Sequence, residues 1–254
     1  MIMMMMMLRH AGRLTNNITG YSRRAVAGAV TQSACRRWIS YDALTIERTN
    51  APKKIPKWEG LRFGTIFSDH MLTASWDVHE GWENPQIKPF QELSLSPAAS
   101  SLHYAIQCFE GMKAYKAVDG SIRLFRPELN MNRLRNSMKA LSMTTDWSND
   151  DLLDCIKELV RLDRNWIPDG EGYSLYLRPT AISTHPYIGL APTENLLLYC
   201  ITMPVGPYYS NGFKPVRLTA DSENVRAWPG GTGNAKIGGN YGKFVCDADI
   251  LYLI

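Results

Sequence analysis

A lysine lies within the most glycine-rich stretch of the chain, residues 230–242, which reads GGTGNAKIGGNYG and holds six glycines in thirteen residues. Glycine lets a backbone approach a ligand closely or adopt positive φ angles, so this density is typical of a binding loop. A lysine amine that is removed from water becomes neutral more easily and can then form a Schiff base with an aldehyde cofactor. The pattern therefore indicates Lys236 as a candidate nucleophile, with a surface lysine in a glycine-rich turn as the alternative.

Two other kinds of ligand-binding loop do not fit this stretch. A phosphate-binding Walker loop needs glycine before its lysine and serine or threonine after it, whereas Ala235 and Ile237 flank Lys236. The dinucleotide-binding pattern G-x-G-x-x-G also fails, because Lys236 occupies its last glycine position. The loop is therefore not interpreted as a nucleotide-binding site of either kind.

A longer pattern between Phe63 and Gly242 is carried by FGTIFSDHML, SLHYAIQCFEGMKAY, IRLFRPELNMNRL, SLYLRPT, PVGPYY and VRAWPGGTGNAKIGGNYG. In these segments and their order, the chain resembles the branched-chain amino-acid aminotransferases of fold type IV. The resemblance implies pyridoxal 5′-phosphate (PLP) as the cofactor. It also implies a homodimer that transfers the amino group of leucine, isoleucine or valine to 2-oxoglutarate, in branched-chain amino-acid biosynthesis and catabolism. D-amino-acid aminotransferases and aminodeoxychorismate lyases are rivals within the fold type, which the extended SLHYAIQCFEG and VRAWPGGTG segments disfavour.

The resemblance assigns four residues to the cofactor. Lys236 resembles the lysine that forms the covalent link to PLP and moves the proton between Cα and C4′. Arg133 resembles the arginine that holds the phosphate, since a guanidinium group can contact phosphate bidentately. Arg226 is similar to a second arginine on the cofactor side, and Tyr241 to a tyrosine hydrogen-bonded to the 3-oxygen of the ring.

Four further residues match the family's substrate pocket, whose apolar and aromatic walls suit branched side chains. Phe109, Tyr176 and Arg178 match residues of the pocket wall, and Tyr104 matches one that family dimers contribute across the subunit interface. Taken alone, the two wall aromatics are core or strand-face residues, and the arginine is a solvated turn residue. Glu110 has no partner carboxylate nearby in the sequence and is interpreted as structural.

The resemblance ends after Gly242, where the chain continues KFVCDADILYLI. In the family, the residues that bind the ring nitrogen and the substrate carboxylate follow that point. We therefore expect a truncated form without catalytic turnover, which at most dimerises with a full-length enzyme or interferes with it.

Local patterns predict the elements that position these residues. Asp119 and Gly120, between strands at 111–118 and 121–126, predict a hairpin with a type I′ turn. Helices are predicted at 130–143 and 150–166, and apolar runs at 174–182 and 195–203 predict buried strands. The second helix opens with Ser148 and acidic residues. One face of it is expected to be apolar: Leu152, Ile156, Leu159 and Val160.

The order of these elements predicts a mixed α/β fold with two domains. A complete small N-terminal α/β domain covers 41–203 and begins with an arm rich in proline and lysine at 51–57. A linker follows at 204–213, where PVGPYYSNGF is rich in turn residues. Only the first part of a larger cofactor domain then covers 214–254, with a strand at 216–220.

Residues 1–40 contain six arginines and no acidic residue, which is typical of a mitochondrial transit peptide. We therefore expect a matrix protein that is processed near residues 37–41. Without these six, 22 of the 28 basic residues remain against 24 acidic ones, so charge gives no argument for a nucleic-acid partner.

The composition excludes several other classes of protein. A chain of 254 residues that is 45% hydrophobic and 20% charged is typical of a globular protein. No apolar run approaches the roughly 20 residues that cross a bilayer, so no membrane role is expected. The five cysteines are dispersed, which disfavours a disulfide framework or a zinc site and fits a reducing compartment.

Overall fold

The structure is a computed structural model that describes residues 37–208, 214–215 and 225–242, all within one compact unit. Most of the predicted leader and the predicted strand at 216–220 lie outside the described residues.

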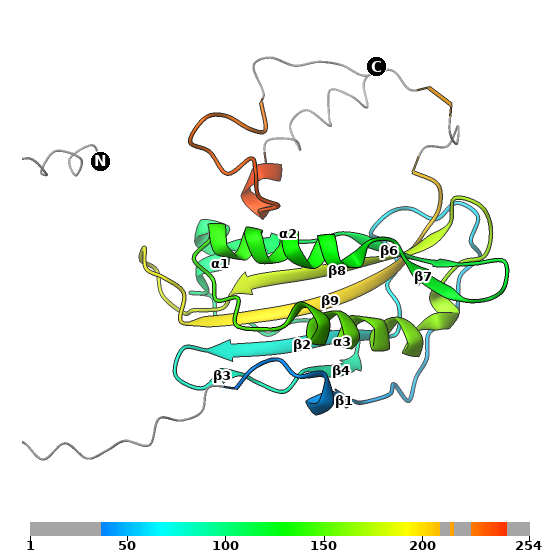
Figure 1. Ribbon diagram of the computed structural model, residues 1–254, viewed down its shortest axis with the longest axis horizontal. Coiled ribbons are helices and arrows are strands. Elements are labelled where there is room, and N and C mark those ends of the chain that lie inside the picture. Colours follow the sequence, from blue (N-terminus) through cyan, green and yellow to red (C-terminus); the bar gives the residue numbers. More distant parts are fainter. Residues whose placement is uncertain (1–36, 209–213, 216–224, 243–254) are drawn as a thin grey trace, which may run out of the picture. The chain divides into compact units, whose positions relative to one another are not determined.

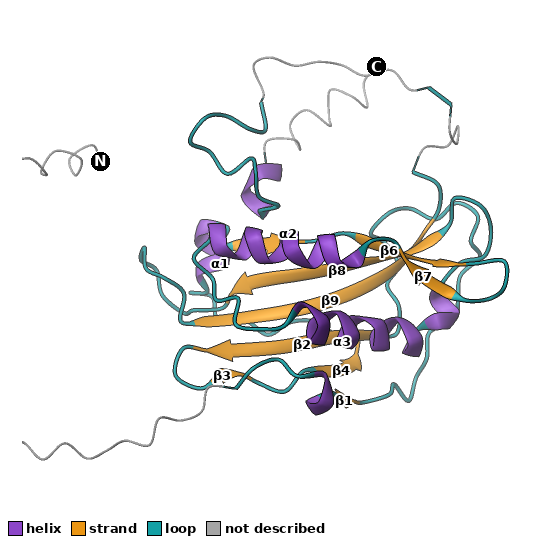
Figure 2. Ribbon diagram, in the orientation of Figure 1, coloured by secondary structure: helices purple, strands orange, loops and turns teal. Residues whose placement is uncertain are grey.

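The described residues form a mixed α/β fold around one sheet, as Figure 2 shows. Its strand order is β1-β4-β2-β9-β8-β6-β7, with β3 paired to β2 and β5 paired to β8. β1 and β4 are parallel, and the other pairs are antiparallel. The strands are β1 (Thr45–Ile46), β2 (His70–Asp77), β3 (Gly81–Trp82), β4 (Gln86–Pro89), β5 (Gln107–Phe109), β6 (Met112–Lys116), β7 (Ile122–Leu124), β8 (Ser174–Ser183) and β9 (Asn195–Val205).

Two long helices pack against the sheet and enclose the core (Figure 1). The helix α2 (Pro127–Ala140) contacts β5 and α3 (Asn149–Leu162), and α3 contacts β2. Buried apolar residues from both helices and from β2, β8 and β9 form one continuous cluster. The short helices are α1 (Ser100–Tyr104), η1 (Tyr41–Ala43), η2 (Arg164–Trp166) and η3 (Gly238–Tyr241).

The start and the apolar face of α3 are as predicted. The Ser148 hydroxyl accepts hydrogen bonds from the backbone N–H groups of Asp150 at 3.2 Å and Asp151 at 3.4 Å. These bonds satisfy two of the N–H groups that a helix leaves unpaired at its first turn. The predicted apolar face is buried: Leu152, Ile156, Leu159 and Val160.

The predicted bounds of both long helices were wrong at one or both ends. α2 begins at Pro127 rather than at residue 130, because proline's fixed φ suits the first helical turn. It ends at Ala140 because Ser142 adopts a φ of 53° and the Met143 N–H donates back to the Met138 carbonyl at 3.0 Å. This is a Schellman motif, whose left-handed position is usually occupied by glycine, so no stop signal marks this end in the sequence.

α3 ends at Leu162, and the predicted continuation to residue 166 is a separate 3-10 turn, η2. The carboxylate of Asp163 binds His70 on β2 rather than its own helix. This tertiary contact holds the chain where the local pattern alone predicts further helix.

The predicted hairpin is confirmed, but its turn is not type I′. Lys116 pairs with Ile122, and the N–H of Ala117 donates to the carbonyl of Ser121 at 2.8 Å. Three residues therefore form the loop, and only Gly120 among them has a positive φ, 78°. The extra residue gives the bulged three-residue loop, which needs glycine at a single position.

Both predicted buried strands are confirmed as β8 and β9, which pair along their whole length from Ser174 opposite Val205 to Ser183 opposite Leu196. β9 continues to Val205, so its last two residues fall in the segment predicted as a linker. Part of that segment, residues 209–213, lies outside the described residues.

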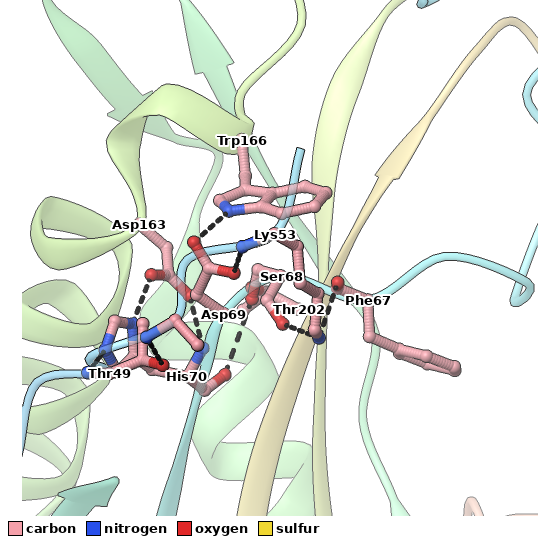
Figure 3. Close-up of polar contacts among 10 residues, drawn as sticks. Thr49, Lys53, Phe67, Ser68, Asp69, His70, Asp163, Trp166 and Thr202 are labelled. Carbon is pink, nitrogen blue, oxygen red and sulfur yellow. Dashed lines mark hydrogen bonds and ion pairs between the residues drawn. The ribbon is translucent and has the colours of Figure 1, made fainter. Parts of the chain in front are cut away.

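A buried polar network connects the N-terminal arm to the sheet, as Figure 3 shows. Nδ1 of His70 lies 2.6 Å from Oδ1 of Asp163, and the backbone N–H of Thr49 donates to Nε2 at 2.9 Å. Because Nε2 accepts a hydrogen bond, the ring proton is assigned to Nδ1. One histidine thereby connects the arm, β2 and the end of α3.

A second contact in Figure 3 involves the arm lysine. The ammonium of Lys53 donates to the carbonyls of Phe67 at 3.2 Å and Ser68 at 2.8 Å. Burial lowers the pKa of Lys53, although Asp69 and then Asp163 oppose that shift. The arm is therefore fixed to the body by charged groups, in agreement with its lysine-rich composition.

Candidate functional site

The backbone of Lys236 is fixed on both sides by the N-terminal part of the chain. Its N–H donates to the hydroxyl of Ser137 on α2 at 2.9 Å, and its carbonyl accepts the N–H of Phe109 on β5 at 3.0 Å. The neighbouring Ala235 and Ile237 are buried in the core. The alternative of a surface lysine in a free turn therefore does not hold.

Most glycines of the loop serve close packing within the protein rather than special backbone angles. Of the six, only Gly230 has a positive φ, 81°. A Cβ added to Gly233 would lie 2.3 Å from the Cβ of Ala227, and one added to Gly238 would lie 2.8 Å from the side chain of Gln107. The glycines let the loop fold tightly on itself and on β5.

Asn240 holds this loop together, and the sequence analysis did not identify it. Its buried amide donates to the carbonyls of Thr232 at 2.9 Å and Ala235 at 3.0 Å, and its oxygen accepts the Thr232 hydroxyl at 2.7 Å. In the sequence it is one polar residue between glycines, so no pattern distinguishes it.

The Lys236 ammonium faces two aromatic rings. Nζ donates to the phenol oxygen of Tyr241 at 3.1 Å and lies 4.5 Å from the centre of the Phe109 ring. Burial opposes ionisation of Tyr241, but hydrogen bonding and charge from Lys236 and then Arg226 outweigh it, so the pKa of Tyr241 is lowered. Three of the predicted residues therefore lie in one contact group with Arg226 beside them.

Arg226 has two contacts in the same loop. Nη1 donates to the carbonyl of Gly233 at 3.0 Å, and the guanidinium carbon lies 5.3 Å from the centre of the Tyr241 ring. This predicted cofactor-side arginine therefore both supports the loop and presents its charge to the tyrosine.

Phe109, Tyr176 and Arg178 form an aromatic and cationic stack on the sheet. Leu175 and Leu177 of β8 face the core, so the residues that alternate with them face the other side. The Arg178 guanidinium carbon lies 4.5 Å from the centre of the Phe109 ring, and Nη2 donates to the Tyr176 hydroxyl at 3.1 Å.

Two more residues shape this stack, and the sequence analysis did not assign either of them to the site. The ring of Phe63 meets that of Tyr176 edge-on, with centres 5.1 Å apart. Gly111 lies under the same tyrosine, and a Cβ added there would be 2.0 Å from its hydroxyl oxygen. Both stand in segments that carry the resemblance, which was the only signal for them in the sequence.

Arg133 projects from α2 beside this group and is paired with Glu110. Its Nε lies 2.6 Å from Oε1 of Glu110, and its Nη2 lies 2.8 Å from Oε2. The hydrogen bonding of that carboxylate is the largest cause that raises the pKa of Arg133. Glu110 needs no partner carboxylate, because its partner is an arginine 23 residues away in the chain.

Tyr104 is the one predicted site residue that the fold does not bring to the others. It ends α1, is 41% exposed, and has its nearest described ring contact with His103, 6.3 Å between centres. No described contact joins it to Lys236 or to Arg178 within this single chain.

Metal and thiol chemistry receive no support from the residues that the structure describes. Within 37–208, 214–215 and 225–242, no three His, Cys, Asp or Glu side chains gather as metal ligands. The described cysteines, Cys108, Cys155 and Cys200, are free and buried. No described helix is both long and apolar enough to cross a membrane.

Comparison with curated proteins gives homologues of one kind. The branched-chain-amino-acid aminotransferase of Monosiga brevicollis is 52% identical over 225 residues, which are 88% of this chain and 57% of that protein. The cytosolic enzyme of Ovis aries is 51% identical over 202 residues, 79% of this chain and 52% of that one. The mitochondrial enzyme of Schizosaccharomyces pombe is 40% identical over 266 residues, 96% and 62% of the two.

The chain thus spans little more than half the length of these relatives. The same holds for a solved structure of a bacterial-type relative, a branched-chain amino acid aminotransferase with pyridoxamine 5′-phosphate. Its TM-score is 0.52 at 28% identity, over 68% of this chain and 53% of that one. The branched-chain aminotransferase of Thermoproteus uzoniensis with norvaline shares the fold at a TM-score of 0.55 and 23% identity, over 70% and 55%.

No protein-family model matches the chain. The relatives and the solved structures nevertheless agree with one another and with the lysine loop, and they confirm the expected type IV fold. Over the portion that it shares with these proteins, the chain belongs to the branched-chain-amino-acid aminotransferase family.

Proposed function

We propose that the chain carries the lysine side of a PLP-dependent aminotransferase site, which acts on leucine, isoleucine and valine with 2-oxoglutarate as amino acceptor. The observation that carries this proposal is the position of Nζ of Lys236, 3.1 Å from the Tyr241 phenol and 4.5 Å from the Phe109 ring centre. The relatives supply the reaction class, and the solved structure with pyridoxamine 5′-phosphate supplies the type of cofactor.

The donor groups fit the chemistry of PLP. Lys236 offers a primary amine for an aldehyde, Tyr241 a phenol for the ring oxygen, and Arg133 a guanidinium that is 55% exposed for a phosphate. When bound, the cofactor supplies a carbonyl that condenses with amines and a ring that withdraws electrons from the substrate Cα.

The residues of the chain then position groups and move protons. Nζ of Lys236 takes the proton from the substrate Cα and returns it, which requires the fixed backbone described above. Tyr241, with its lowered pKa, donates a stronger hydrogen bond to an anionic ring oxygen. Phe109 and Tyr176 offer apolar ring faces to a branched side chain, and Arg178 braces both rings.

The test is a visible absorption spectrum of the purified chain with PLP. We expect a band of lysine-bound cofactor that is absent from Lys236→Ala and retained in Lys139→Ala, an exposed lysine of α2. Adding leucine and then 2-oxoglutarate measures amino transfer. A band that persists in Lys236→Ala would contradict the proposal. A Lys236-dependent band without amino transfer would instead support the expected form that lacks turnover.

We also propose the domain arrangement expected from the sequence: a domain at 41–203, a linker at 204–213 and a cofactor domain that begins at 214. In a homodimer, Tyr104 would reach the partner's pocket, which its exposure allows. Sedimentation of the wild-type chain and of Tyr104→Ala measures whether the chain dimerises and whether this residue contributes.

We further propose that residues 1–40 direct the protein to the mitochondrial matrix. The family has both cytosolic and mitochondrial members, so the address depends on the leader. A fluorescent protein fused to residues 1–40 should enter mitochondria. The same fusion with its six arginines changed to alanine should stay outside, because the positive charge drives import.

A further inference from the structure

We propose that Glu110 is a positioning residue, whose buried carboxylate holds the Arg133 guanidinium side-on so that Nη1 faces an anionic group of the cofactor. This inference rests on the proposed function, in which Arg133 binds the phosphate. The sequence suggested only a structural role for Glu110, and no similarity to a relative assigns it this one.

The carboxylate of Glu110 is fully buried, with 0% of its side chain exposed, and every contact holds it in one orientation. Oε2 accepts hydrogen bonds from the Gly111 N–H at 3.1 Å and from the Asn130 amide at 2.9 Å. Arg133 completes the set with one bond to each carboxylate oxygen. A buried carboxylate that is bound by four donors cannot rotate without losing several bonds at once.

The orientation of Arg133 leaves one end of its guanidinium available. Glu110 occupies Nε and Nη2, and no described residue accepts a hydrogen bond from Nη1. The Arg133 side chain is 55% exposed, so this end is open while the other is fixed. A planar guanidinium that is fixed along one edge presents the opposite N–H groups in a defined direction.

Glu110 also lies in the middle of a tripeptide that contacts three parts of the site. The N–H of Phe109, before it, donates to the Lys236 carbonyl at 3.0 Å. Gly111, after it, lies directly under the Tyr176 hydroxyl. One short stretch between β5 and β6 therefore sets the relative positions of the lysine, the arginine and the pocket tyrosine.

The experiment compares binding of PLP with binding of pyridoxal, which lacks the phosphate. The readout is the visible band that depends on Lys236, titrated for the wild type, Glu110→Gln and Glu110→Asp. We expect Glu110→Gln to weaken PLP binding about tenfold or more, as for a lost charged hydrogen bond, and to leave pyridoxal binding unchanged. Glu110→Asp, which keeps the charge, should recover part of the loss.

Matched variants separate positioning from a general structural role. Glu80→Gln removes an exposed carboxylate that pairs with Arg37 at 3.2 Å and should change neither titration. In an Arg133→Gln background, Glu110→Gln should cause no further loss of PLP binding, because the group that it positions is gone. Equal weakening of PLP and pyridoxal by Glu110→Gln would overturn the inference. If Glu110→Gln does not fold, the same comparison is made with Glu110→Asp.

A second measurement does not depend on the cofactor. Side-chain NMR of Arg133 should show an Nε–H signal that exchanges slowly in the wild type and is lost in Glu110→Gln. Inorganic phosphate should shift the Nη signals in the wild type alone. If the wild type gives no band with PLP, the proposed function fails, and the phosphate titration still decides the inference. No phosphate-dependent shift of Arg133 in the wild type would overturn it.

Discussion

At the scale of single residues, the phenol of Tyr241 is the group whose titration reports on the site. Its pKa is lowered because hydrogen bonding and charge from Lys236 and Arg226 favour the phenolate more than burial opposes it. A group with a lowered pKa loses its proton at a lower pH, so Tyr241 should ionise before the other tyrosines as the pH rises.

Ultraviolet difference titration of the cofactor-free chain measures this ionisation. In Lys236→Met the hydrogen bond and the charge of Nζ are both removed, so the early phase should move to higher pH. Lys139→Met, which changes an exposed lysine of α2, should leave the phase in place. An early phase that stays in place in Lys236→Met would show that the lysine does not act on Tyr241.

Gly111 belongs to the same scale, because its lack of a Cβ is what admits the Tyr176 hydroxyl. In Gly111→Ala the new Cβ would lie 2.0 Å from that oxygen, so Tyr176 must move and its bond with Arg178 should break. We expect the free energy of unfolding to fall by about 1–3 kcal/mol, as in other overpacked sites. Urea denaturation measures the loss.

Gly206→Ala is the matched control, since its Cβ would meet Tyr173 at an ordinary 3.4 Å. Equal stability of Gly111→Ala and the wild type would mean that Tyr176 moves without cost. The glycine would then have no packing role.

At the scale of elements, α3 depends on the cap that Ser148 provides. Ser148→Ala leaves the N–H groups of Asp150 and Asp151 without the hydroxyl that now accepts them. We expect a loss of about 1 kcal/mol in the free energy of unfolding. Ser148→Asp should retain most of the stability, because its carboxylate accepts the same bonds.

Thermal or urea unfolding measures the effect, with Ser94→Ala as a control at an exposed serine. The result would contradict the prediction if both alanine variants unfolded at the same midpoint. The helix would then be held by its buried face alone.

At the scale of the whole molecule, the network in Figure 3 connects segments that are distant in the chain. Asp163→Ala removes the acceptor of both the ring Nδ1–H and the backbone N–H of His70, in a buried position. An unsatisfied buried donor costs about 1–3 kcal/mol, so we expect a loss of at least about 2 kcal/mol. Asp169→Ala breaks only an exposed pair with Lys116 and should cost less than about 1 kcal/mol.

Hydrogen exchange at the Thr49 N–H, which donates to the same histidine, should become faster in Asp163→Ala and not in Asp169→Ala. An unchanged exchange rate would show that the arm is fixed by its other contacts.

Much of the fold could be predicted from the sequence because its signals are local. The Ser148 cap, the 3–4 spacing along α3 and the apolar runs of β8 and β9 each act over a few residues. The glycine-rich stretch around Lys236 was equally visible. For Phe109, Tyr176 and Arg226, the resemblance pointed to a site that the fold then brings together.

Only the tertiary structure decided which residues become partners. Glu110 pairs with Arg133 across 23 residues of chain, and Lys236 is fixed by Ser137, 99 residues before it. The end of α3 depends on Asp163 binding His70, which is 93 residues away. Such contacts leave no periodic trace in the sequence, because they depend on how the strands pair and on which side chains are buried together.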